Sequence, residues 1–506
     1  MAQTTMVPSP QSPAAMLAAS VDDVRPERNS IFDGPASHLQ SIEANSGAAF
    51  TRSLGLRMDS MEAPRLHMFA WNLGLRDEPI KTSSFRGSIV DILSSQEMSE
   101  LASVYFAEVH PVYGFVDRVS VESMITSRWT LDLRSEISDT ILCGIGALGC
   151  LFSHKRSHLE AQLVHIARMM LEQSTNFPNQ SVQHVIGWLL RVIYLRLTAS
   201  PHATWMASCT LMHTIEATRL HLEPSIEFVL SHPIEVCDPE LRRRLYTVAY
   251  LFNTWISYDN GRSRVDLHGA SCSSPTADSS GCSTDFLDIC QLSRFLGPAK
   301  IRDSSELEKA LSRAYLLAPT HPMLKLVKCN IVLCIYRRLR APGFAIPTRS
   351  LEQILSVIDM GLTTIEQMIQ TNSPWWHVSN VPFQIVCTLL AMDTSKSVSR
   401  LQRSLRALHS VYQTYGTNVT EESYTTARVL VRLHRRQKQE DLAMLDECLT
   451  DSVEPFINHN VGEETTQFDA GNYQSENGWQ DLNNAFLAYF DEAHLGHMYN
   501  TEGAMQ

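Results

Sequence analysis

Apolar residues recur every three or four positions through most of this chain, and strict alternation of apolar and polar residues is nearly absent. The first spacing places side chains on one face of an α-helix, whereas alternation would place them on one face of a strand. The pattern predicts an all-α fold, a large array of roughly twelve to fifteen helices. Representative apolar stripes are Met98, Leu101, Val104, Tyr105 and Val109; Leu241, Leu245, Val248, Leu251, Phe252 and Trp255; and Leu351, Ile354, Leu355, Ile358, Leu362, Ile365 and Ile369.

The same pattern divides the chain into a helical middle and two aperiodic ends. Residues 1–60 are rich in Pro, Ser, Ala and Gln, and we expect them to be disordered. Residues 65–450 are expected to form the helical domain, and the small polar residues at 269–284 a surface loop within it. Residues 451–506 are polar and mostly aperiodic, so a second disordered segment is expected there.

Charge is unevenly distributed along the chain. The net charge is −12, and the residues from Asp441 to Gln506 include 13 acidic side chains and no Lys or Arg. The rest of the chain is therefore close to neutral and offers no broad basic face for nucleic acid. No apolar run is long enough to span a bilayer, so we expect no membrane association. The odd number of cysteines, 11, favours a reducing compartment.

The stretch CGIGALGC at residues 143–150 has the G-x-G-x-x-G spacing of dinucleotide-binding sites. That motif requires a preceding strand and βαβ units, which the sequence does not indicate. Apolar residues spaced at three and four continue through the glycines, and Ser138 or Asp139 is a suitable N-cap. We therefore interpret the stretch as a buried helix whose glycines let another helix approach closely.

Motifs for catalysis are not evident. The sequence has no G-x-S-x-G, H-E-x-x-H or phosphate-loop lysine motif. Cys209, His213 and His221 have helical spacing, but no second Cys or His pair accompanies them, so we interpret them as core residues. We identify no catalytic, cofactor-binding or metal-ligating residues and expect no cofactor and no enzymatic activity.

The stretch YDNGRSRV, Tyr258 to Val265, allows two interpretations. Arg262 and Arg264 could form a regulatory turn that pairs with acidic groups or an anion. Alternatively, Gly261 ends a helix and the arginines brace the fold, which is the interpretation that we favour.

Four other short stretches each allow a structural and a functional interpretation. The Pro-aromatic stretches at 110–115 and 373–383 fit either turns that fill gaps between helices or the lining of an apolar pocket. The basic runs at 242–244 and 434–438 fit either salt-bridged helix surface or nuclear import signals. We favour the structural interpretation for all four.

The acidic tail contains one amphipathic stretch. Its acidic residues keep it solvated, while its apolar side chains can dock into a coactivator groove as a short helix. A terminal helix that folds back on the core is an equal alternative. The residues of this predicted activation segment are Trp479, Leu482, Phe486, Tyr489 and Phe490.

Five stretches, in order, resemble the fungal-specific transcription factor domain, which is the middle homology region of the zinc binuclear-cluster regulators. The resemblance covers residues 65–450 and implies an all-α regulatory domain, a nuclear location, and contacts with the transcription machinery or coactivators. It also implies control of carbon use, stress responses or secondary-metabolite gene clusters. The stretches are LHMFAWNLGLR (66–76), YFAEVHPVYGFVDR (105–118), RVIYLRLTASPHATWMASCTLMHTIEATRLH (191–221), RRRLYTVAYLFNTWISYDNGRSRV (242–265) and PWWHVSNVPFQIVCTLLAMDT (374–394).

The family's N-terminal six-cysteine zinc cluster has no counterpart here, because the first cysteine is Cys143. Such clusters need thiolates to fold, so we do not expect this chain to bind DNA by itself. We expect a transcription regulator, in a homo- or heterodimer, whose DNA targeting comes from a zinc-cluster partner or an upstream exon. The alternative is an inhibitor that heterodimerises with full zinc-cluster regulators.

Overall fold

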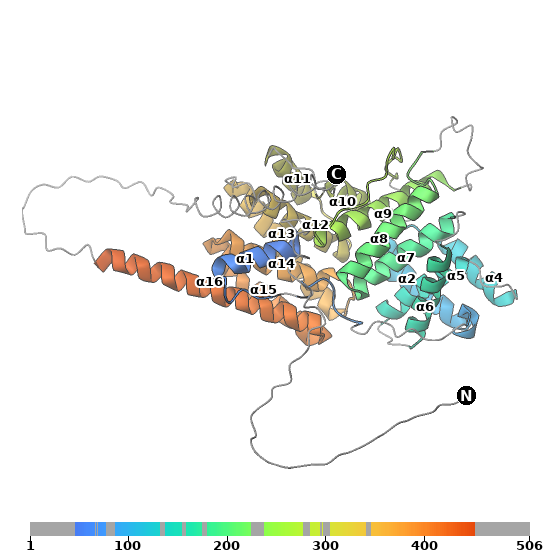
Figure 1. Cartoon of the computed structure of the whole chain (residues 1–506), viewed down its shortest axis with the longest axis horizontal. Coiled ribbons are helices and arrows are strands. Elements are labelled where there is room, and N and C mark those ends of the chain that lie inside the picture. The colour runs from blue at the N-terminus through green and yellow to red at the C-terminus, as the bar shows by residue number, and fades with distance from the viewer. Residues whose placement is uncertain are drawn as a thin grey trace, which may run out of the picture. The chain divides into compact units, whose positions relative to one another are not determined.

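The expected helices are present throughout the part of the chain that the structure describes (Figure 1). The computed structural model describes residues 46–450 apart from 66, 68, 77–86, 132–136, 154–157, 175–179, 224–236, 277–283, 294–295, 297–303 and 341–345. Within these residues every regular element is a helix, none of them long and apolar enough to cross a membrane. The predicted all-α fold is therefore confirmed.

The described residues contain sixteen α-helices and one short 3₁₀ helix. In chain order they are α1 (Gly47–Met58), η2 (Ile89–Asp91), α2 (Ser95–Glu108), α3 (His110–Tyr113), α4 (Arg118–Thr130), α5 (Ser138–Phe152), α6 (His158–Ser174), α7 (Val182–Thr198), α8 (Pro201–Ala217), α9 (Pro239–Asp259), α10 (Thr284–Ser293), α11 (Ser304–Leu316), α12 (Pro322–Arg340), α13 (Thr348–Gln370), α14 (His377–Met392), α15 (Ser395–Tyr415) and α16 (Asn418–Thr450).

Local side-chain chemistry fixes where many helices begin and end. The Ser94 hydroxyl accepts from the Glu97 amide, while the Glu97 carboxylate accepts from the Ser94 amide, which starts α2 with a capping box. Asp117 caps α4 through its carboxylate, which accepts from the Ser120 amide at 2.7 Å. Gly114 and Gly416 end α3 and α15 with φ values of 56° and 58°, a left-handed conformation that glycine adopts without steric cost.

The glycine-rich stretch lies inside α5, in which every residue from Asp139 to Phe152 is buried. A Cβ atom added at Gly149 would lie 2.5 Å from the backbone carbonyl oxygen of Leu101 in α2, and one at Gly144 would lie 2.8 Å from the Cβ of Leu190 in α7. The glycines therefore allow α2 and α7 to pack directly on α5. The predicted buried helix is confirmed, and no strand precedes it among the described residues.

Asp139 has a different role from the N-cap that the sequence suggested. Helix α5 begins at Ser138 after Ile137, and the fully buried carboxylate of Asp139 accepts a hydrogen bond of 2.8 Å from the Arg128 guanidinium of α4. Removing the Arg128 charge would leave a carboxylate in an apolar core. The N-cap prediction is therefore wrong, because an ion pair across two helices replaces local capping.

Helix α1 lies within the N-terminal segment that the sequence predicted to be disordered. It packs against α14 and α16, and the Thr51 hydroxyl lies 3.4 Å from the Cys387 sulfur. The prediction of disorder is thus wrong for residues 46–60. Its buried face relies on Ala48, Gly55 and a single large side chain, Leu54, which gives only a weak apolar signal. Residues 1–45 lie outside the described part.

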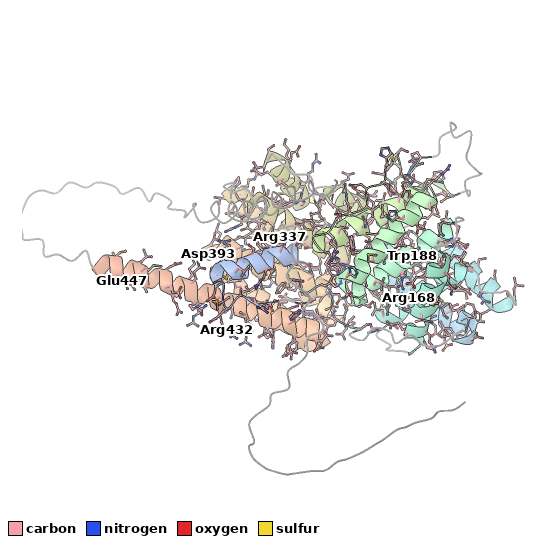
Figure 2. All side chains as sticks on the ribbon, viewed as in Figure 1. Arg168, Trp188, Arg337, Asp393, Arg432 and Glu447 are labelled. Atoms are coloured by element: carbon pink, nitrogen blue, oxygen red, sulfur yellow. The ribbon has the colours of Figure 1, made fainter. Side chains whose placement is uncertain are left out.

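Helix α16 is fastened to the body through its basic run. Asp393, at the end of α14, is labelled in Figure 2. It accepts from Lys438 at 2.6 Å and lies 3.1 Å from the His434 ring nitrogen. Arg436 pairs with Asp59 and, at 3.1 Å, with Glu62. The basic run at 434–438 is therefore salt-bridged, as we had favoured.

A buried cation connects segments that are far apart in sequence. Arg196 of α7 is 2% exposed, and its guanidinium carbon lies 3.5 Å from the ring centroid of Trp71 and 3.6 Å from that of Trp376. It donates to the Trp71 carbonyl and to the Asp259 carboxylate at the end of α9. Burial lowers the pKa of Arg196 to about 10, so it remains charged at neutral pH. One side chain thus holds α7, α9 and α14 together.

Candidate functional site

The turn after α9 is built on a glycine C-cap. Gly261 has a φ of 60°, and its amide donates to the Tyr258 carbonyl at 3.0 Å. The Arg262 amide donates to the Ser257 carbonyl at 2.8 Å, which completes the end of the helix. The chain therefore reverses direction and runs back along α9.

The two arginines of this turn occupy different surroundings. The Arg262 guanidinium lies 4.9 Å from the ring centroid of Trp205 in α8, and the Trp205 indole donates to the Ser263 carbonyl at 3.0 Å. Arg264 donates to the Tyr250 hydroxyl at 2.6 Å and lies 2.8 Å from the Asp266 carboxylate. Both arginines brace the turn against neighbouring helices. Arg264 also lines a surface groove, whose lining does not include Arg262.

The groove lies between α9, α10 and the segment 264–275, and its volume is about 930 Å³. This volume is within the range of sites that hold small organic molecules. Helix α9 supplies one wall, α10 the second, and the segment 264–275 the third. The lining residues are Tyr246, Thr247, Tyr250, Leu251, Thr254, Arg264, Asp266, Leu267, Ala270, Cys272, Ser273, Ser274, Pro275, Leu287, Cys290, Gln291 and Ser293.

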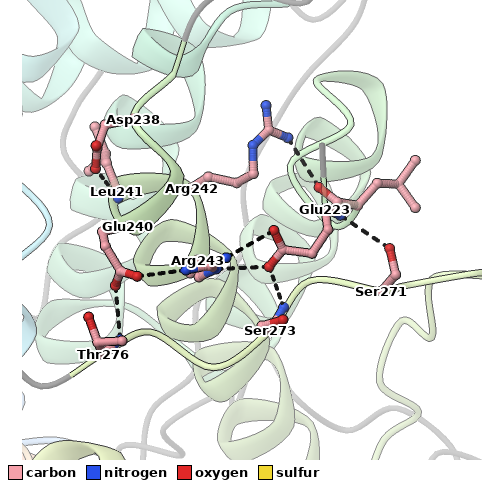
Figure 3. Close-up of polar contacts among 10 residues, drawn as sticks. Glu223, Asp238, Glu240, Leu241, Arg242, Arg243, Ser271, Ser273 and Thr276 are labelled. Atoms are coloured by element: carbon pink, nitrogen blue, oxygen red, sulfur yellow. Dashed lines mark hydrogen bonds and ion pairs between the residues drawn. The ribbon is translucent and has the colours of Figure 1, made fainter. Parts of the chain in front are cut away.

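A clamp of three charged residues holds the third wall in place (Figure 3). Arg243 of α9 donates to Glu223 at 2.8 Å and to Glu240 at 2.7 Å. Each carboxylate also accepts a hydrogen bond of 2.9 Å from a backbone amide, Glu223 from Ser273 within the segment 264–275 and Glu240 from Thr276 directly after it. The start of the predicted loop at 269–284 is therefore fixed on α9, and residues 277–283 lie outside the described part.

The clamp remains charged over a wide pH range. Hydrogen bonds from Arg243 and the Ser273 amide lower the pKa of Glu223 to about 2. A carboxyl group with a lowered pKa contributes stability above its ordinary pKa of 4.5, and this contribution is lost as the pH falls towards 2. At neutral pH the clamp is therefore charged and holds the segment 264–275 in place.

The basic run at 242–244 is more buried than a surface interpretation allows. Arg242, 3% exposed, donates to the carbonyls of Arg219 and Leu222, and Arg244, 8% exposed, donates to the Gly114 carbonyl. Only the middle residue takes part in the clamp at the surface. Inward-facing arginines are not accessible to an import receptor. The prediction of a salt-bridged helix surface is therefore confirmed for Arg243 and wrong for Arg242 and Arg244, whose guanidinium groups donate to buried backbone carbonyls.

The Pro-aromatic stretches fill the core. The Tyr113 ring lies 5.2 Å from that of Phe252 and 6.1 Å from that of Trp375, and all three side chains are buried. Neither stretch contributes to the groove lining. They pack between helices, as we had favoured over a ligand pocket.

The remaining candidate residues of the sequence do not come together as a site. The core interpretation is wrong for His213, which is exposed and lies 3.5 Å from Glu216. His221 is buried, as expected of a core residue, and its carbonyl accepts from the amides of Ser271 and Cys272. Among the described residues, no group of three or more His, Cys, Asp or Glu side chains is placed to hold a metal ion. The predicted activation segment, Trp479 to Phe490, lies outside the described part.

Sequence reasoning did not identify the groove. Tyr246 and Tyr250 are both half-buried on α9, beside the stripe that was predicted to face the core. Only the position of α10 and the segment 264–275 shows that these rings face a groove rather than a neighbouring helix. The one sequence feature that pointed to this region was RSRV at residues 262–265, shortly after the end of α9.

Comparison with known proteins identifies the family. The model of the fungal specific transcription factor domain matches residues 102–313, which run from α2 into α11 and include the whole groove. Protein RDR1 of Gibberella zeae is 40% identical over 79% of this chain and 74% of its own length. Transcription factor kojR of Aspergillus oryzae is 38% identical over 88% and 81%, and Protein RDR1 of Saccharomyces cerevisiae is 32% identical over 80% and 74%. No solved structure matches. The chain therefore belongs to the fungal-specific transcription factor domain family and is a transcription regulator of that type.

Proposed function

We propose that this protein regulates transcription in the nucleus by binding other molecules and without catalysing a reaction. The helical body would receive a signal, and the acidic tail would contact the transcription machinery or coactivators. The observation that carries the proposal is the position of the groove within residues 102–313, the segment that matches the family model. Occupation of the groove would shift the body between two packings and thereby expose or mask the tail.

The turn that contains Arg262 and Arg264 is proposed as the element that responds to the groove. Arg264 is both a lining residue and a hydrogen-bond partner of Tyr250, so a ligand that displaces the Tyr250 hydroxyl changes the support of the turn. Arg262 would transmit this change to α8 through its contact with Trp205. We therefore propose that the turn has a regulatory role in addition to the bracing contacts of its two arginines.

For the tail, residues 451–506, we propose a role in activation. Its segment around Trp479, Phe486 and Phe490 combines rings with acidic side chains and contains no Lys or Arg. Such a segment stays solvated while free and can bury its rings in a coactivator groove as a short helix. A metabolic or secondary-metabolite gene cluster is the proposed target.

DNA targeting is proposed to depend on a zinc-cluster module outside residues 1–506. The given sequence has no cysteine before Cys143, so its N-terminal part cannot supply the thiolates of a zinc cluster. Either a zinc-cluster partner chain or a preceding segment would provide the contact. The same observation favours the second candidate, an inhibitor that pairs with complete regulators and withholds them from DNA.

A reporter assay separates the two candidates. Residues 451–506 are fused to a heterologous DNA-binding domain, and we expect reporter expression several-fold above that of the binding domain alone. The matched control keeps every acidic residue but replaces Trp479, Leu482, Phe486, Tyr489 and Phe490 by alanine, which removes the side chains that would dock. Loss of activation in this control is expected. A silent wild-type fusion would instead support the inhibitor.

A further inference from the structure

The groove beside α9 has a lining without net charge. Arg264 and Asp266 are its only charged members among the described residues, and they lie 2.8 Å apart as an ion pair. The other lining side chains are aromatic, aliphatic, thiol, hydroxyl or amide groups. A charged ligand would lose hydration without gaining an unpaired opposite charge, so the lining favours an uncharged ligand.

The wall formed by α9 is aromatic. Tyr246 and Tyr250 lie one helical turn apart, with ring centroids separated by 6.0 Å and ring planes inclined by 38°. Both rings line the groove, and Leu287 of α10 contributes an apolar side chain to the lining. The Arg264 guanidinium lies over the Tyr250 ring, 5.2 Å from its centroid, so a planar ligand ring would stack on Tyr246.

The lining also contains hydrogen-bonding groups. Thr254 is 4% exposed, and its hydroxyl oxygen has no hydrogen-bond partner among the described residues. A buried hydroxyl group without a partner is unfavourable. This oxygen has almost no accessible surface, so a ligand oxygen would reach it only after a small shift of the groove wall. Thr247, Ser274 and Gln291 add further polar groups to the lining.

We infer that this groove binds an uncharged, planar, hydroxylated aromatic molecule. Binding would not require a large rearrangement, because the Glu223–Arg243–Glu240 clamp already holds the segment 264–275 in place. A preformed site loses less conformational entropy when the ligand binds. The regulatory consequence of binding rests on the proposed function, whereas the binding itself does not.

Titration of the purified full-length chain with 2-naphthol, followed by the fluorescence of the probe, tests this inference. We expect saturable binding of 2-naphthol. The 2-naphthoate anion, which is charged, and 1-decanol, which has no ring, are each expected to bind about tenfold more weakly. 2-Naphthoate keeps the planar ring system but carries a charge. 1-Decanol keeps the ten carbons and the hydroxyl group of the probe but is not planar, and its binding is measured by displacement of 2-naphthol. Equal or tighter binding of either one, or no saturable binding of 2-naphthol, would contradict the inference.

Variants locate the binding site. Tyr246→Ala removes one stacking ring and Thr247→Trp fills the groove, so each is expected to weaken 2-naphthol binding by about tenfold. Tyr315→Ala is the control, because Tyr315 is 40% exposed on α11 and lies outside the groove lining. Far-UV circular dichroism and melting temperature verify that each variant is folded. Unchanged binding in folded Thr247→Trp would place the probe elsewhere and overturn the inference.

The two proposals fail separately. Reporter activation by the tail without 2-naphthol binding would refute the ligand site, and with it the groove as the receiver of the signal, but would keep the tail's role in activation. Binding at the groove with a silent tail would support the ligand site and refute the tail's role in activation.

Discussion

Replacing Gly149 by alanine is expected to destabilise the protein by about 2–3 kcal/mol, although alanine favours helices over glycine. The added Cβ would lie 2.5 Å from the Leu101 carbonyl oxygen, and neither backbone can move without separating α2 from α5. The helix-propensity gain of about 0.5–1 kcal/mol offsets only part of that cost. Thermal denaturation followed by circular dichroism measures the difference.

Gly146→Ala in the same helix is the matched control. A Cβ at Gly146 would come closest to the end of the Leu163 side chain, at 3.1 Å, with the Met98 sulfur at 3.7 Å, and the Leu163 side chain can adjust. We expect a change within about 1 kcal/mol, because a small rotamer adjustment relieves the contact. Equal melting temperatures for the two variants would contradict the assignment of Gly149 to a backbone contact.

Arg196→Met is expected to cost about 3–5 kcal/mol, the range found when one member of a buried ion pair is removed. Methionine has similar bulk, but it leaves the Asp259 carboxylate without its cation and the Trp71 carbonyl without its donor. The stacking of the guanidinium between two indole rings is also lost. Chemical denaturation of the purified chain provides the measurement.

Two comparisons separate this effect from the loss of an ordinary ion pair. Arg400→Met breaks a bidentate pair with Asp359 on the surface, where such pairs contribute about 0–1 kcal/mol. Combining Arg196→Met with Asp259→Asn removes the uncompensated charge and should restore part of the lost stability. If Arg196→Met proves no more costly than Arg400→Met, the buried cation does not connect the helices.

The helices could be predicted from local sequence patterns because the apolar residues on the buried face of each helix recur every three or four positions. Helix α5 was predicted in spite of its glycines, because the three-and-four spacing of apolar residues continues through them and the sequence before them does not indicate a strand. Helix α1 was missed, because Ala48 and Gly55 contribute to packing through small size and not through hydrophobicity. The N-cap of α5 was misassigned, because Asp139 has its partner on another helix.

Long-range contacts could not be predicted from one sequence. Arg196 is stacked by Trp71 and Trp376, which lie 125 residues before it and 180 residues after it, and no local pattern relates the three positions. Likewise, the groove forms between α9, α10 and the segment 264–275, and the packing of these three segments determines which of their side chains line it. Among its lining residues, only Arg264 was selected from the sequence as a functional candidate, because it belongs to a short arginine-containing turn that follows α9.

Transcript levels in cells that contain the intact gene and in cells that lack it provide the most direct test of regulation by binding. The account predicts that a defined group of transcripts changes on deletion and is restored by the wild-type chain. The Arg196→Met chain, which we expect to be destabilised, should restore them poorly. Unchanged transcripts, together with loss of a metabolic reaction that the purified chain carries out by itself, would contradict the account.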